Sequence, residues 1–443
     1  MPQNTQYTDA IMRILNQAGE PISDGEMMRL GEEIYGEDWK KVNLIRLKCI
    51  RTALRSVGVV THPKRGSWGL TPDAAAQLDR WKAVGEGGIW REHLRLRDEE
   101  KQTIEPAPPD PPQPRGASIL ELTKTLVETW GPSGYEHRIR DLIREEVAAL
   151  ADETWLDGLG NLICRVGSGG KKVLIAAHMD EIGLMANYQE PESGYLRFTN
   201  LGGLRPDTLN GNRVQFEDGT VGVIAAQEGG GQALSDFYID VQNEIGGNAT
   251  AVGQPAGFMR EMQTRGARIV AKSLDDRIGC VVAIEAMRRL NKSTPNELYF
   301  AFTVQEEVGL RGAKTAAQSL HPDIGIAVDV TGSGDQIRGR KMQVRLGGGA
   351  AIKVHDPGLV VPVAIKNWMI ERCEADGIPY QLELLAGGTT DASAIQLADA
   401  GVPSGCISIP TRYLHTTSET VDIGDVNACI DLLSALLANP IEL

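Results

Sequence analysis

Several features that would assign this chain to a specialised class of protein are missing from its sequence. The six cysteines are scattered, and none forms a Cys-x-x-Cys pair, so we expect reduced thiols rather than a disulfide framework. No apolar run approaches the length of a membrane span, and the chain does not open with a basic flank followed by an apolar core. We therefore expect a cytoplasmic protein with no membrane partner. A net charge of −14 argues against the whole molecule being a nucleic-acid coat.

Histidine is also scarce, with seven residues, yet two histidines stand near the ends of apolar, strand-like runs. His178 follows the run at 173–177, and His415 follows the run at 405–409 after a short connection. Acidic residues end three further runs in the same way: Asp275, the pair Glu306 and Glu307, and Asp329. If these strands share one sheet, the side chains meet at the edge where open α/β sheets bind their ligands.

The residue types in this set indicate a metal site. Imidazole nitrogens and carboxylate oxygens suit zinc, cobalt or manganese. There are more acidic oxygens than a single structural zinc needs, which points to two ions that share a carboxylate, as in hydrolytic two-metal sites. Taken singly, each residue has a simpler explanation as a helix cap, a turn residue or a hydrogen-bonded core histidine. The coincidence of all of them favours a catalytic metal centre.

Several motifs in the second part of the chain resemble those of the tetrahedral aminopeptidases, a family of co-catalytic metallopeptidases. The most specific are Ala-His-Met-Asp-Glu-Ile-Gly at 177–183, Leu-Asp-Asp-Arg-Ile-Gly at 274–279 and Gln-Glu-Glu-Val-Gly at 305–309. Further matches occur at 131–136, 387–392 and 409–415. The likeness extends from about residue 117 to the end, in the family's order and spacing.

The resemblance implies a role for each residue of the set. One metal ion would be bound by His178 and Asp329, the other by Glu307 and His415, with Asp275 bridging both. Glu306 would be the general base, and Asp180 would orient the imidazole of His178. A cis peptide is implied between Asp275 and Asp276. The expected cofactors are two divalent ions, with zinc favoured over cobalt or manganese, and the implied function is a metal-dependent aminopeptidase that acts on peptide substrates.

We predict an α/β protein with several domains. The catalytic domain, residues 117–186 and 266–443, is expected to be an α/β/α sandwich around a mixed sheet. A small β-barrel is expected to be inserted at 187–265, where an Asp-Gly pair at 218–219 separates two strand-like runs and predicts a hairpin. The resemblance implies that the barrel makes subunit contacts in a homo-oligomer, a dimer that can build up to a dodecamer.

The first part of the chain is expected to be a separate domain. Six prolines within residues 104–116 indicate an extended linker. Residues 1–103 show two helical patterns, a third expected at 42–57, and then a β-hairpin, which resembles a winged helix. Eight basic and no acidic residues lie between Lys40 and Arg65, a distribution that suits DNA phosphates. Winged helices also contact proteins, so both DNA and a protein partner stay open.

Two other functions compete with the aminopeptidase. The chain could be a DNA-binding or sensing protein with a peptidase-like body, although such a body would not need every ligand and the base. It could also hydrolyse another amide or a glycan on the same fold. Glycosidases use two carboxylates across a sugar and no metal, which argues against a glycan substrate.

Overall fold

The chain forms two compact units, Met1–Pro112 and Gln113–Leu443. The structure is a computed structural model. The residues that it describes are 7–18, 22–35, 54, 60–61, 67–71, 74, 115–241, 252–337, 339 and 341–443. Among these residues, none of the helices is both long enough and apolar enough to cross a membrane.

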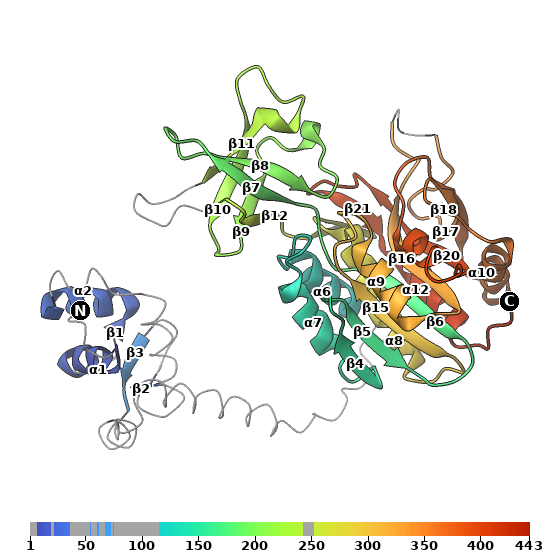
Figure 1. Cartoon of the computed structure of the whole chain (residues 1–443), viewed down its shortest axis with the longest axis horizontal. Coiled ribbons are helices and arrows are strands. Elements are labelled where there is room, and N and C mark those ends of the chain that lie inside the picture. The colour runs from blue at the N-terminus through green and yellow to red at the C-terminus, as the bar shows by residue number, and fades with distance from the viewer. Residues whose placement is uncertain are drawn as a thin grey trace. The chain divides into compact units, whose positions relative to one another are not determined.

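The described part of the N-terminal unit contains two helices and a small sheet (Figure 1). The helices are α1 (Tyr7–Ala18) and α2 (Asp24–Tyr35), and the strands are β1 (Ile22–Ser23), β2 (Val60–Thr61) and β3 (Ser67–Leu70). The sheet is antiparallel with the order β1-β3-β2. Helix α2 starts with a capping box, in which Ser23 and Glu26 each accept the backbone N–H of the other.

Most of the other expectations for this unit fall on residues outside the described ranges. They include the third helix at 42–57, the basic stretch and most of the linker at 104–116. The winged helix and its DNA contact therefore stay predictions. Helix α6 begins at Arg115, two residues before the start at 117 that was expected for the catalytic domain. A helix can begin there because the last proline of the linker is Pro114.

The larger unit is built on a twelve-stranded mixed sheet. Its strands are β4 (Glu153–Leu156), β5 (Leu162–Val166), β6 (Lys172–His178), β13 (Gln263–Arg265), β14 (Arg268–Ala271), β15 (Glu297–Thr303), β16 (Ile324–Gly332), β17 (Ala350–Asp356), β18 (Leu359–Val360), β19 (Tyr380–Leu384), β20 (Ser404–Arg412) and β21 (Glu419–Asp422). The main path is β13-β14-β21-β20-β16-β6-β15-β5-β4, and β17 joins it at β20 and carries β18 and β19. The central strands β15, β6, β16 and β20 are parallel neighbours, so their carboxyl ends lie at one edge of the sheet.

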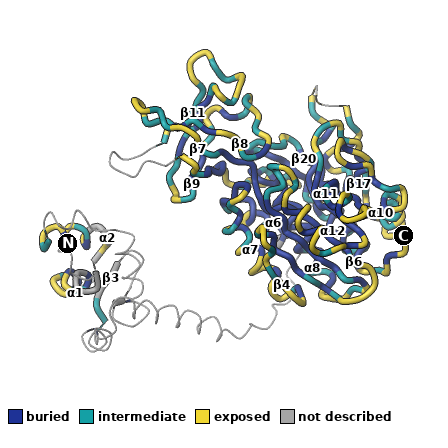
Figure 2. The backbone as a smooth tube through the Cα atoms, in the orientation of Figure 1, coloured by how far each residue is buried: buried dark blue, intermediate teal, exposed yellow. Residues whose placement is uncertain are grey.

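Helices cover both faces of this sheet, as expected for a sandwich (Figure 1). They are α6 (Arg115–Glu128), α7 (His137–Val147), α8 (Leu274–Leu290), α9 (Arg311–Leu320), α10 (Val363–Asp376), α11 (Asp391–Gln396) and α12 (Ile423–Leu437). Alternation along β6 separates two cores: Val173 and Ile175 pack with α6, α8 and α12, whereas Leu174 and Ala176 pack with α9 and α11. Figure 2 shows that the central strands and α8 are buried along most of their length.

The expected insertion is a closed barrel of six strands with the order β10-β11-β8-β7-β12-β9. The strands are β7 (Gly183–Gln189), β8 (Leu196–Leu201), β9 (Arg213–Phe216), β10 (Val221–Ala226), β11 (Phe237–Val241) and β12 (Pro255–Phe258), with short 3₁₀ turns η2 (Pro206–Thr208) and η3 (Leu234–Asp236). The hairpin predicted at Asp218 and Gly219 joins β9 to β10, and Gly219 has a φ of +93°.

The boundaries expected for the barrel, 187–265, are displaced from those observed. The barrel strands run from Gly183 to Phe258, and the next strand, β13, belongs to the large sheet. No break is visible in the sequence at residue 183, because the apolar alternation of β7 follows the end of β6 with only four residues between them.

Candidate metal centre

Six of the residues singled out from the sequence line one pocket at the carboxyl edge of the central strands. The pocket has a volume of about 470 Å³. The six residues are His178, Asp275, Glu306, Glu307, Asp329 and His415. His178 ends β6, Asp329 lies in β16, and the two glutamates follow β15, so the parallel register brings them together.

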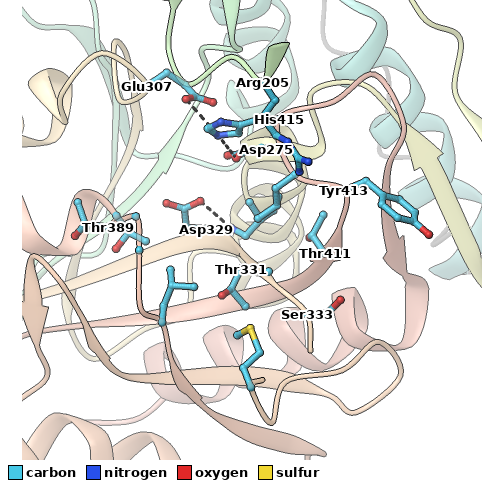
Figure 3. Close-up of a pocket in the computed structure, with 18 of the residues that line it drawn as sticks. Arg205, Asp275, Glu307, Asp329, Thr331, Ser333, Thr389, Thr411, Tyr413 and His415 are labelled. Carbon is cyan, nitrogen blue, oxygen red and sulfur yellow. Dashed lines mark hydrogen bonds and ion pairs between the residues drawn. The ribbon is translucent and has the colours of Figure 1, made fainter. Parts of the chain in front are cut away.

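Asp275 occupies the middle of this group. Its Oδ1 lies 3.0 Å from Nε2 of His178, and its Oδ2 lies 3.2 Å from Nε2 of His415. Figure 3 shows Asp275 and Glu307 on either side of the imidazole of His415. The peptide bond between Asp275 and Asp276 is cis, as the resemblance implied. Helix α8 begins at Leu274, but Asp275 and Asp276 have non-helical backbone angles within it.

Two sets of ligand atoms within this group are close enough to hold an ion. One consists of His178, Glu306 and Asp329, and the other of His178, Asp275 and Glu307. Within each set, the candidate ligand atoms lie within 4.8 Å of one another. The donor atoms are nitrogen and oxygen, which fits the zinc, cobalt or manganese that the sequence indicates.

The raised pKa values of the buried carboxyls also fit a site for a bound cation. Burial, opposed by His415, raises the pKa of Glu307 to about 8. Burial likewise raises the pKa of Glu306 and Asp329 well above their ordinary values, and each carboxyl repels the others. Oε1 of Glu307 is buried with no hydrogen-bond partner among the described residues. Divalent cations here would offset this repulsion and give the oxygen a partner.

Two buried acidic residues hold the backbone that carries the glutamate pair. Oδ1 of Asp180 accepts the N–H of Glu306 at 3.0 Å, and Oδ2 accepts the N–H of Glu307 at 3.2 Å. Oε1 of Glu136 accepts the N–H of Gln305 at 3.1 Å. Three consecutive N–H groups therefore bind to carboxylates that lie outside the pocket lining.

Asp180 was expected to orient His178, and in the structure Asp180 contacts both His178 and Ser133. Nδ1 of His178 lies 3.2 Å from the carbonyl oxygen of Asp180 and 3.4 Å from its Oδ1. Oδ2 of Asp180 also accepts the hydroxyl of Ser133 at 2.6 Å. The side chain therefore links His178, the glutamate backbone and the motif at 131–136.

Residues that the sequence did not identify hold the second histidine. Glu419 is buried, and its two oxygens accept the backbone N–H groups of His415 at 2.9 Å and Asp275 at 3.0 Å. The carbonyl oxygen of Gly203, on a barrel loop, lies 2.7 Å from Nδ1 of His415. A Cβ at Gly203 would lie 2.7 Å from the same nitrogen, so the close approach requires glycine. A carbonyl at this position leaves Nε2 free to bind a metal.

Comparison with known proteins gives a consistent result. The family model described as M42 glutamyl aminopeptidase matches residues 160–432. The lysyl aminopeptidase of Pyrococcus furiosus is 36% identical over 337 residues, which cover 72% of this chain and 96% of that protein.

Comparison with solved structures also finds peptidases. Aminopeptidase APDkam598 from the archaeon Desulfurococcus kamchatkensis aligns with a TM-score of 0.69 and 38% identity over 73% of this chain and 95% of its own. The TET1 peptidase of Pyrococcus horikoshii, which can assemble into a tetrahedron or a large octahedral shell, aligns with a TM-score of 0.64 and 32% identity over 72% of this chain and 99% of its own. This chain belongs to the M42 glutamyl aminopeptidase family.

Proposed function

We propose that this protein is a metal-dependent aminopeptidase that hydrolyses the N-terminal residue from peptides at a two-metal centre. The observation that carries the proposal is the position of Asp275, whose two oxygens each approach one histidine, at 3.0 and 3.2 Å. A carboxylate between two imidazoles can bridge two cations. Membership of the M42 family and the activity named for its relatives support the reaction class.

The proposed ligands divide into two groups around this bridge. His178 and Asp329 would hold one ion, and Glu307 and His415 would hold the other. Bound divalent ions act as Lewis acids on a peptide carbonyl and lower the pKa of water. Zinc suits these ligands, and cobalt or manganese would also be accepted by nitrogen and oxygen donors.

Glu306 is the proposed general base. Its side chain lines the pocket, with Oε2 3.9 Å from Nε2 of His178. Although it lies close enough to His178 and Asp329 to help hold an ion, it is not one of the five proposed ligands. Asp180 fixes its backbone N–H, so the carboxylate is held at the pocket surface without being part of the bridge. In this position it can take a proton from the attacking water and pass it to the leaving amine.

The charge of the pocket explains why a free amino terminus would be recognised. Four acidic side chains line it, and Arg205 is the only lysine or arginine among the described lining residues. An ammonium group would be attracted to any of these carboxylates that the bound ions leave uncompensated, whereas an acylated terminus carries no charge. This supports removal of residues from a free N-terminus over cleavage within a chain.

The test is hydrolysis of aminoacyl p-nitroanilides by the full chain, before and after removal of metal with a chelator. We expect release of p-nitroaniline from free aminoacyl substrates, loss of activity with the chelator, and recovery when zinc, cobalt or manganese is added. The matched N-acetyl substrates should react much more slowly. A rate that the chelator leaves unchanged would contradict the metal centre, and equal rates on acetylated substrates would contradict the aminopeptidase.

We also infer a homo-oligomer, with the barrel as a contact surface. The support is the similarity to the TET1 peptidase, whose subunits form closed shells. Light scattering on the purified chain would measure the mass of the particle. A monomer at micromolar concentration would contradict this inference and leave the aminopeptidase proposal intact.

A further inference from the structure

Three charged side chains are buried together behind the wall of the pocket. Lys353 on β17 and Glu383 on β19 lie opposite each other in the parallel register of the two strands, and both are fully buried. Nζ of Lys353 donates to Oε1 of Glu383 and lies 3.4 Å from Oδ2 of Asp356, which ends β17. None of these residues belongs to the proposed metal centre.

Each of the two carboxylates also holds a threonine of the pocket wall. Oγ1 of Thr331 donates to Oε1 of Glu383 at 2.7 Å, and Oγ1 of Thr389 donates to Oδ1 of Asp356 at 2.9 Å. Both threonines line the pocket and are labelled in Figure 3. They come from separate segments: Thr331 lies in β16, two residues after Asp329, and Thr389 lies in the loop before α11.

We propose that Lys353 is a positioning residue for the substrate pocket, which fixes Thr331 and Thr389 relative to each other through Glu383 and Asp356. The proposal rests on the proposed aminopeptidase function, since it concerns the pocket in which the peptide would lie. Lys353 touches neither substrate nor metal ligands, and acts only through the two carboxylates.

Lys353 is needed because its positive charge offsets the buried negative charges of Glu383 and Asp356. An ionised carboxylate only accepts hydrogen bonds, so each threonine hydroxyl must donate to its own carboxylate. Without the lysine, the two buried carboxylates would lose the cation that contacts both of them, and an uncompensated buried charge is strongly destabilising. Although burial opposes it, the attraction of Glu383 raises the pKa of Lys353 above its ordinary value, so the amine stays charged.

The wall around Thr389 leaves little room for another arrangement. Oδ1 of Asp356 also accepts the backbone N–H of Gly358 at 2.9 Å. A Cβ at Gly358 would lie 2.5 Å from Oγ1 of Thr389. The hydroxyl is therefore held between a carboxylate and a glycine, and a change in the carboxylate must displace it.

The experiment is steady-state hydrolysis of aminoacyl p-nitroanilides by the full chain with Lys353→Met. We expect KM to rise about three- to tenfold with kcat and metal content little changed, since the variant disturbs substrate binding rather than the base. Arg289→Met, which removes an ion pair with Asp431 between α8 and α12, is the control and should keep the wild-type KM. A folded Lys353→Met protein with the wild-type KM would overturn the proposal.

If Lys353→Met fails to fold, a second pair of variants tests whether the contact between Thr389 and Asp356 positions the pocket wall. Thr389→Val removes the hydroxyl donor, whereas Thr389→Ser keeps it. We expect the valine variant to raise KM and the serine variant to restore the wild-type value. Equal KM values for both would overturn the role of this contact. If the wild-type chain hydrolyses no aminoacyl substrate, the proposed function fails first, and that result is distinct from an active enzyme that Lys353 does not affect.

Discussion

The buried carboxylate of Glu136 accepts the backbone N–H of Gln305 across 3.1 Å. Gln305 has a φ of +56°, in the left-handed region that non-glycine residues seldom adopt, and it directly precedes the proposed base, Glu306. The same oxygen of Glu136 accepts the N–H of Gly134 at 2.6 Å. Glu136 therefore ties the turn before the base to a segment far away in the sequence.

We expect Glu136→Ala to lower kcat and leave KM nearly unchanged, because the turn that presents Glu306 loses its acceptor. Glu136→Gln should keep most of the activity, since the amide oxygen can accept the same two N–H groups. The comparison needs equal metal content in both variants. If the alanine and glutamine variants have the same kcat, the contact with Gln305 does not position the base.

The stability of the wild-type protein and that of Glu136→Gln should depend differently on pH. Burial, followed by the charge of Asp180, raises the pKa of Glu136 to about 7, above its ordinary value of 4.5. A raised pKa in the folded state means that this group stabilises the fold below pH 4.5, and that the contribution is lost as pH rises through about 7. Because glutamine does not ionise, the melting temperature of Glu136→Gln should fall less than that of the wild type between about pH 5 and 8. Parallel curves would show that Glu136 does not titrate in this window.

Glu306→Gln tests the base itself. The amide has nearly the same shape but cannot accept the proton, so we expect kcat to fall about 10²- to 10⁴-fold. Metal content and melting temperature should stay close to the wild-type values, because neither proposed ligand set needs this side chain. Near-normal turnover would exclude Glu306 as the base and turn attention to another carboxylate of the pocket.

The metal-ligand candidates could be predicted because each carries a local signal, an acidic residue or histidine that follows an apolar strand-like run. Glu419 gave no such signal, since its function depends on accepting backbone N–H groups from two distant segments. Lys353 was missed for a similar reason. In the sequence it is one cation within a short strand, and only the parallel register of β17 and β19 brings Glu383 beside it.

Asp275→Ala should lose both ions together. The carboxylate lies between His178 and His415, and without it the two cations would repel each other with no shared ligand. Elemental analysis of the purified variant should find less than one ion per chain, with activity absent. One ion still tightly bound would mean that Asp275 is a terminal ligand of a single site.

Removal of residues 1–112 should leave an active peptidase. The larger unit begins at Gln113, and helix α6 begins at Arg115, so this cut keeps the helix whole. A cut after residue 116 would remove the first two residues of α6 and serves as the comparison, with a lower melting temperature expected. An inactive product from the first cut would show that the N-terminal unit is needed by the catalytic unit.

The charge of Arg205 gives a prediction about which N-terminal residues are preferred. Arg205 lies on a barrel loop and lines the pocket, and its Nη2 donates to Asp207 at 2.9 Å. Its side chain is 54% exposed, so an ion pair with an acidic substrate side chain would be screened by solvent. Arg205→Met should therefore lower kcat/KM for an N-terminal glutamate about two- to fivefold relative to leucine.

Arg205→Lys is the matched control, because it keeps the positive charge while changing the shape of the donor group. The measurement is the ratio of kcat/KM for glutamyl and leucyl p-nitroanilides, which cancels differences in metal content between preparations. The lysine variant should retain most of the wild-type ratio, and the methionine variant should lose it. If both variants keep the wild-type ratio, Arg205 faces the pocket without contacting the substrate side chain, and selection must come from the apolar wall around Leu385 and Leu414.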